Sequence, residues 1–96
     1  MDPHPMDMTK AIQSAKTRSD HEALAKHYEN TAKEMRAKKQ EQQKMLEQYE
    51  SNTSHYGKEA LDLQTHCRNL IYQYEQAEKS NLDMADIHRK MANEIK

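Results

Sequence analysis

The fold is decided by residues 60–95, which read ALDLQTHCRNLIYQYEQAEKSNLDMADIHRKMANEI. Side chains suited to a core recur along this segment at alternating spacings of three and four residues. Such a heptad pattern is typical of a helix that buries one stripe against a partner helix. We therefore expect one continuous helix from Lys58 to about Ile95. Its stripe comprises Ala60, Leu63, Cys67, Leu70, Tyr74, Ala77, Asn81, Met84, His88, Met91 and Ile95.

A looser version of the same pattern precedes this segment, from Asp20 to about Glu50. Residues 51–57, SNTSHYG, lie between the two patterns and hold the turn-forming residues. Folding back near Ser54 pairs positions that are equally distant from the turn, so that His21 faces His88. The sequence thus predicts an antiparallel hairpin. The stripe of its first helix comprises His21, Leu24, Tyr28, Thr31, Met35, Lys38, Gln42, Met45 and Tyr49, with Ala25, Ala32 and Leu46 beside it.

The segment 1–18 is expected to be separate from this hairpin, which we place at 19–96. The first eight residues contain both prolines and no periodicity, which indicates a flexible tail. Asp7 or Thr9 can cap a short helix that follows the tail. Ser19 with Glu22 three residues later is typical of a capping box, and we expect it to start the first long helix.

The composition favours helices and self-association. The chain has 96 residues, of which 34% are hydrophobic, and a single glycine, so strands and tight turns have little to be built from. Two helices cannot cover all of their own apolar surface. We expect an all-α hairpin, with a short N-terminal helix, that forms a homodimeric four-helix bundle. The flank left for the partner comprises Leu61, Ile71, Leu82, Ala85, Ile87 and Ala92.

The charges argue against several functions. Fifteen basic and sixteen acidic residues give a net charge of -1, with the two signs interspersed. This lacks the basic surface that nucleic acids and anionic membranes attract. No stretch is apolar enough to cross a bilayer. We find no nucleophile with a partnered base and no phosphate-binding loop, so we expect a protein without enzymatic activity.

Histidine and methionine offer a candidate metal site. The chain has six His and seven Met, and imidazole with thioether donors suits copper. Met84, His88 and Met91 share one helix face, and the hairpin register places His21 opposite His88. The set His21, Met84, His88 and Met91 can therefore bind Cu(I), or Cu(II) if a water or a carboxylate such as that of Asp20 or Glu22 joins. The alternative is that the Met residues fill the core and the His residues fix the register.

A second candidate is the pair His66 and Cys67. A thiolate beside an imidazole can bind a metal or respond to oxidation, and a symmetric dimer could link two copies of Cys67. Adjacent residues on a helix point about 100° apart, however, which favours an inert, buried cysteine.

Three segments resemble those of small exported bacterial helical proteins of unassigned function. They are residues 20–29 (DHEALAKHYE), 66–70 (HCRNL) and 84–92 (MADIHRKMA). The resemblance implies a periplasmic location and places His21, Cys67 and His88 in characteristic segments. The resemblance implies no activity. The histidine and methionine residues themselves predict copper sequestration or delivery. The alternatives are a metal-free structural module or one that binds another protein, and a redox-responsive dimer linked through Cys67.

Overall fold

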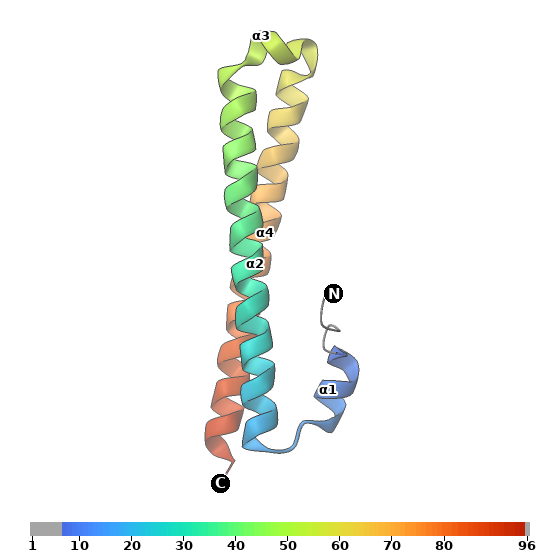
Figure 1. Ribbon diagram of the computed structural model, residues 1–96, viewed down its shortest axis with the longest axis vertical. Helices are drawn as coiled ribbons and strands as arrows, with labels where there is room; N and C mark the ends of the chain where they lie inside the picture. The colour runs from blue at the N-terminus through green and yellow to red at the C-terminus, as the bar shows by residue number, and fades with distance from the viewer. Residues whose placement is uncertain (1–6, 96) are drawn as a thin grey trace, which may run out of the picture.

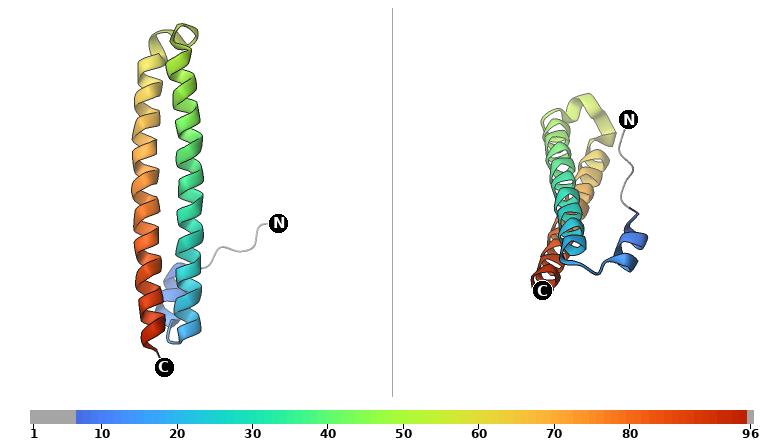
Figure 2. Two further views of the ribbon diagram at one scale, coloured as in Figure 1. Left: turned by 90° about the vertical axis from the view of Figure 1, so that its left-hand side faces the viewer. Right: turned by 60° about the horizontal axis from the view of Figure 1, so that its bottom comes forward.

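The computed structural model describes residues 7–95 and shows an antiparallel pair of long helices (Figure 1). The short helix α1 spans Met8–Ser14, and α2 spans Arg18–Ser51. A helical turn, α3 (Thr53–Tyr56), and a 3-10 turn, η1 (Gly57–Glu59), lead into α4 (Ala60–Glu94). The two long helices lie side by side along their whole length (Figure 2), and the molecule measures 62 × 29 × 16 Å. The predicted all-α hairpin is confirmed.

The start of α2 differs from the sequence-based expectation. Thr17, not Ser19, is the N-cap residue, and Asp20, not Glu22, completes the capping box. The Thr17 hydroxyl accepts a hydrogen bond from the Asp20 backbone N–H at 3.0 Å, and the Asp20 carboxylate accepts one from the Thr17 N–H at 3.0 Å. Both residue pairs have the right spacing, but a threonine at position 17 lets the helix begin two residues earlier.

The N-terminal helix α1 begins at the first of its two predicted caps. Asp7 is its N-cap, as predicted, and its carboxylate accepts a hydrogen bond from the Lys10 N–H. Met8, which we assigned to a flexible tail, is the first residue of α1. The rest of that tail, residues 1–6, lies outside the described residues.

The connection between α2 and α4 is itself helical. Asn52 interrupts the helix with φ -124° and ψ 43°, and α3 follows directly. Gly57 then adopts φ 63°, a left-handed conformation that glycine enters without strain. The chain thus reverses within residues 52–59, centred close to Ser54 as expected, and α4 begins at Ala60 and not at Lys58.

The buried stripe of α4 is shifted by one residue at every second position. Gln64, Glu78, Ala85 and Ala92 are buried, whereas the predicted Met84 and Met91 are 37% and 40% exposed. The positions that hold Ala60, Cys67 and His88 are buried as predicted. The shift arises because apolar residues are adjacent at several of these positions, as in Met84–Ala85, so that the spacing fits both. Small alanines at the contact let the helices approach closely.

Helix α2 shows the same shift in its C-terminal half. Lys38 and Met45 are exposed, and their successors Lys39 and Leu46 are half-buried. In the N-terminal half both neighbouring positions are used, because Leu24, Ala25 and Ala32 are all buried. Leu24 is the one large side chain of the described residues that is fully buried. The core is therefore thin and rich in alanine.

Buried polar groups in the seam are paired. Gln64 Nε2 donates a hydrogen bond to the Tyr49 carbonyl oxygen at 3.1 Å. Glu78 accepts from Arg36 at 2.6 Å and from Lys39 at 3.3 Å. These contacts satisfy groups whose unpaired burial would destabilise the hairpin. Among residues 7–95, no helix combines the length and hydropathy that crossing a bilayer requires.

Candidate functional site

Two histidines meet at the open end of the hairpin. His21 lies in the first turn of α2, and His88 lies in the last two turns of α4. The antiparallel pairing brings these distant positions together, as the sequence predicted. Their Nδ1 atoms are 3.1 Å apart, and the two residues are only 6% and 8% exposed. The site is thus a buried pair of imidazoles between the helices.

Aromatic stacking fixes the position of the pair. The rings of His21 and His88 meet edge to edge through their Nδ1 atoms, with centroids 5.4 Å apart and planes inclined by 19°. Tyr28 lies seven residues after His21 on α2, and its ring stacks on that of His88 with centroids 5.6 Å apart and planes inclined by 6°. His27 contacts the edge of the Tyr28 ring. Sequence reasoning placed Tyr28 on the stripe of the first helix but did not predict its contact with His88.

The short contact between the histidines defines their charge. A hydrogen bond between two Nδ1 atoms needs a donor on one ring and an acceptor on the other, so at least one imidazole is neutral. Burial lowers the pKa of His88 below its ordinary value, and the charge of a protonated His21 lowers that pKa further. The pair is therefore held with fewer protons than two exposed histidines would carry.

The polar groups near the histidine pair at the open end of the hairpin form hydrogen bonds and an ion pair with other residues. Arg18 Nε donates a hydrogen bond to the Ala92 carbonyl oxygen at 3.2 Å, which ties α2 to the last turns of α4. Asp20 accepts hydrogen bonds from the backbone of Lys16 and Thr17, and these lower its pKa. Glu22 lies 3.7 Å from the Arg18 guanidinium. The carboxylates that we considered as additional metal ligands thus have other partners.

The two predicted thioether ligands lie at the edge of the site. Met84 precedes His88 by four residues and Met91 follows it by three, so both flank it on α4. The predicted stripe required both methionines to be buried beside the imidazoles, and neither is. Within the described range, 7–95, no three His, Cys, Asp or Glu side chains are grouped as a metal site. Of the four predicted ligands, the structure brings together His21 and His88.

Cys67 and His66 occupy different faces of α4. Cys67 is 4% exposed in the seam, and burial raises the pKa of its thiol. His66 is exposed to solvent. Because the thiol is buried and protonated, it lacks the thiolate character of a reactive cysteine.

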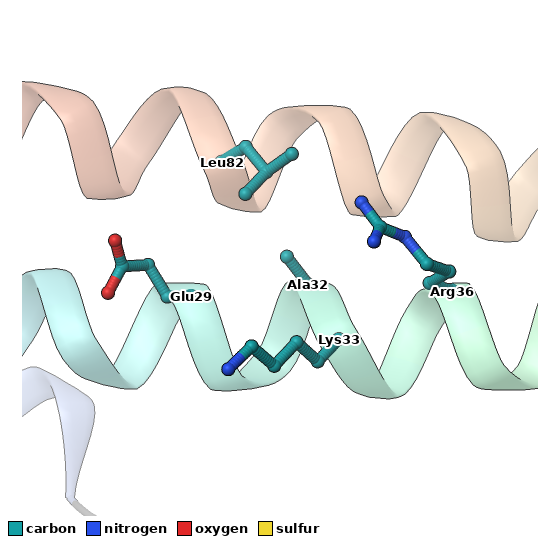
Figure 3. Close-up of a pocket in the computed structure, with 5 residues that line it drawn as sticks. All are labelled: Glu29, Ala32, Lys33, Arg36 and Leu82. Carbon is teal, nitrogen blue, oxygen red and sulfur yellow. The ribbon is translucent and has the colours of Figure 1, made fainter.

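A shallow groove of about 270 Å³ lies between the helices near their middle (Figure 3). Its lining includes Glu29 and Arg36, which are both held in ion pairs, with Arg89 and Glu78 respectively. Polar groups do not converge on a common point in this groove, so it presents no site for chemistry. The remaining lining residues are Ala32, Lys33 and Leu82.

Comparisons of the chain with protein-family models, with curated proteins and with solved structures gave no match. The candidate function therefore depends on the geometry of the histidine pair and its surroundings.

Proposed function

We propose that this protein is a non-enzymatic helical hairpin that binds copper at His21 and His88 for sequestration or delivery. The observation that carries the proposal is the buried 3.1 Å approach of the two Nδ1 atoms. A metal ion with bonds of about 2.0–2.1 Å to both nitrogens would subtend an angle of about 100°. This angle is close to tetrahedral and suits a d10 ion such as Cu(I).

The thioethers of Met84 and Met91 are the candidates for the remaining ligand positions. Met side chains have three rotatable bonds and soft sulfur donors, which favour Cu(I) over harder ions. Their partial exposure leaves room for both side chains to turn toward His88. A soft donor set of two imidazoles and two thioethers would bind the ion as Cu(I), as expected for storage or transfer.

Binding at this pair would compete with protons. A metal ligand must present a free nitrogen, so the Nδ1 proton shared in the pair must move to Nε2 or leave. The lowered pKa of His88 assists this exchange at neutral pH. Copper affinity should therefore fall at acid pH, because protonation of His88 sets in only below its ordinary pKa of 6.5.

The test is an anaerobic titration of the metal-free protein with Cu(I) against a colorimetric chelator. His21→Ala and His88→Ala should each weaken Cu(I) binding by about 100-fold or more, with far-UV circular dichroism unchanged. His66→Ala is the matched control, because it removes an exposed histidine from the same helix α4 and should leave the affinity within about twofold. Full affinity in both His21→Ala and His88→Ala would refute the copper site.

The thioether ligands can be tested separately. Met84→Leu and Met91→Leu nearly conserve volume, so they remove sulfur with little effect on packing. We expect them to weaken Cu(I) binding and to leave Zn(II) binding, which prefers nitrogen and oxygen donors, largely unchanged. An equal loss for both metals would indicate altered packing and not a lost ligand.

A second candidate function is a metal-free structural module or one that binds another protein. The exposure of large apolar side chains on α4 favours it, among them Leu61 at 72% and Ile87 at 51%. In that case native mass spectrometry after incubation with Cu(I), Cu(II) and Zn(II) would show no bound metal. We further infer that the hairpin pairs with a second copy into a four-helix bundle, in either function.

The redox-responsive dimer has less support. Cys67 is buried with a raised pKa, so a link between two copies would require the hairpin to open first. Non-reducing electrophoresis after mild oxidation tests it directly: a covalent dimer would favour this function. The periplasmic location implied by the resemblance remains a proposal, which cell fractionation would test.

A further inference from the structure

We propose that one side of the hairpin, which we call the apolar side, is the surface on which a second copy of this chain docks. This inference rests on the proposed self-association and identifies the face that carries it. The apolar side contains Leu63, Leu70, Ala77, Met84, Ile87 and Met91 of α4. Its α2 half contains Met45 together with the exposed charged residues Glu34, Lys38 and Glu41, so the apolar character belongs to the α4 half.

The ion pairs between the helices all lie on the opposite side, within the described part of the chain. On α2, the paired residues Glu29, Arg36 and Glu50 each follow a stripe position by one residue. On α4, Arg68 and Arg89 likewise follow Cys67 and His88 by one. Because the helices are antiparallel, residues displaced in the same sense from the stripe share one side of the hairpin. We call this the ion-pair side.

The residues of the apolar side are displaced from the stripe in the opposite sense to those of the ion-pair side. Ile87 precedes His88 by one residue and Met84 precedes it by four, which places both across the stripe from Arg89. On α2, Met45 precedes the stripe residue Tyr49 by four in the same way. Met45, Met84, Ile87 and Met91 are 37%, 37%, 51% and 40% exposed, so this side presents large apolar groups to solvent.

On α4 this side carries no Asp, Glu, Lys or Arg from residue 63 to residue 91, although such residues make up 32% of the chain. Charged residues are depleted at the centres of protein interfaces because burying them is costly. The stretch extends for roughly 40 Å at about 1.5 Å per residue. The positions are Leu63, His66, Leu70, Gln73, Ala77, Ser80, Met84, Ile87 and Met91.

The surface area of the hairpin is sufficient for such a partner. The chain exposes 7335 Å². A folded monomer of its mass exposes about 5,700 Å² by the usual scaling. The excess of about 1,600 Å², which includes the surface of the N-terminal segment, exceeds the roughly 800 Å² that each partner contributes to an interface of standard size. A second hairpin is the occupant that matches the α4 half of this face in length, since α1 already lies beside Asp20 and Leu24 on the α2 half at the open end.

The charge of the chain is compatible with pairing of identical copies. A net charge of -1 per chain gives little long-range repulsion between two copies. A two-fold axis would place the same apolar side of both chains together, as in most homodimers. The outcome is a four-helix bundle with the ion pairs on its two outer faces.

The experiment is sedimentation equilibrium of the metal-free protein with a chelator and a reductant, so that neither metal nor a disulfide contributes. The wild-type protein should sediment at twice the 11.3 kDa chain mass. Met45→Glu combined with Ile87→Glu should raise the dimer dissociation constant by about 100-fold or more. Leu61→Glu combined with Leu82→Glu is the matched control, because these exposed apolar residues lie on the ion-pair side, and its dissociation constant should stay within about threefold.

A second measurement leaves the interface residues in place, in case the variant chain does not fold alone. Single cysteines at Ser80 on the apolar side and at Glu75 on the ion-pair side, each combined with Cys67→Ser, are labelled with a maleimide. Labelling at position 80 should slow about tenfold or more as the protein concentration is raised, whereas labelling at position 75 should not change.

The outcomes separate the two proposals. A monomer at every concentration overturns both self-association and the docking face. A dimer that resists Met45→Glu with Ile87→Glu, or that is weakened by the control pair instead, overturns the docking face alone. Equal protection of positions 75 and 80 would also overturn it.

Discussion

The burial of Leu24 gives a quantitative test of the hairpin core. Leu24 is 2% exposed and is the largest side chain that the described residues bury fully. Leu24→Ala removes three carbon atoms, worth about 2.4 kcal/mol at about 0.8 kcal/mol per buried methylene. A residual cavity adds to this cost, and leucine-to-alanine changes in cores destabilise by about 2–5 kcal/mol. Because a thin two-helix core can partly close over the gap, we expect about 2.5–3.5 kcal/mol.

Leu82→Ala is the matched control for this prediction. Leu82 is 39% exposed at the edge of the groove, so the same truncation opens no closed cavity and should cost about 1 kcal/mol. Alanine has a similar effect on helix propensity in α2 and α4, so the difference between the variants isolates burial. The assay is urea unfolding followed by circular dichroism at one fixed protein concentration, since association shifts apparent stability. Equal losses for the two variants would refute the assigned packing.

Three further predictions concern protonation, reactivity and backbone strain. Because burial lowers the pKa of His88, the unfolded state binds more protons than the folded state below pH 6.5, and the folded protein should lose stability as the pH falls below that value. Thermal unfolding between pH 7 and pH 5 should show this loss. His88→Gln should reduce the dependence of the unfolding temperature on pH. The buried thiol of Cys67, with its raised pKa, should react with a disulfide reagent at least about 100-fold more slowly in the native protein than in urea. Gly57→Ala should cost about 1–3 kcal/mol in urea unfolding. A Cβ there meets no atom within 4 Å, but φ 63° with ψ -139° is a backbone conformation that essentially only glycine adopts.

The hairpin itself could be predicted from the sequence because three independent signals agree. The periodicity of residues 60–95, the turn-forming cluster after Glu50 and the equal lengths on both sides of it all require an antiparallel pair. The capping residues were less certain, since both Ser19–Glu22 and Thr17–Asp20 satisfy the same spacing. Local spacing identifies a possible capping box. Where two are possible, the one that starts the longer helix is formed, and here that is Thr17–Asp20.

The contact between His21 and His88 could also be predicted, because it depends only on the register. The positions of Met84 and Met91 could not. A heptad pattern in which Met84 is followed by Ala85, and Met91 by Ala92, fits two stripes that share Asn81, His88 and Ile95 and differ by a rotation of about 50°. The partner helix decides between them: Ala25 and Ala32 allow close approach, and small residues then face small residues. The methionines are thereby displaced to the apolar side.

This displacement connects the two proposals. Had Met84 and Met91 filled the seam, the histidines would have been surrounded by fixed apolar packing, and the apolar side would have lost its largest groups. Their position at the edge leaves the sulfur atoms free to turn toward His88 or toward a docking partner. The seam holds two imidazoles at a point where an apolar pair of equal volume could be as stable, since replacing both partners of a buried hydrogen bond is often nearly neutral. Stability alone therefore does not account for a histidine pair at this position. Binding of a metal that takes two nitrogen donors is the proposed reason, and fixing the register of the hairpin is the alternative.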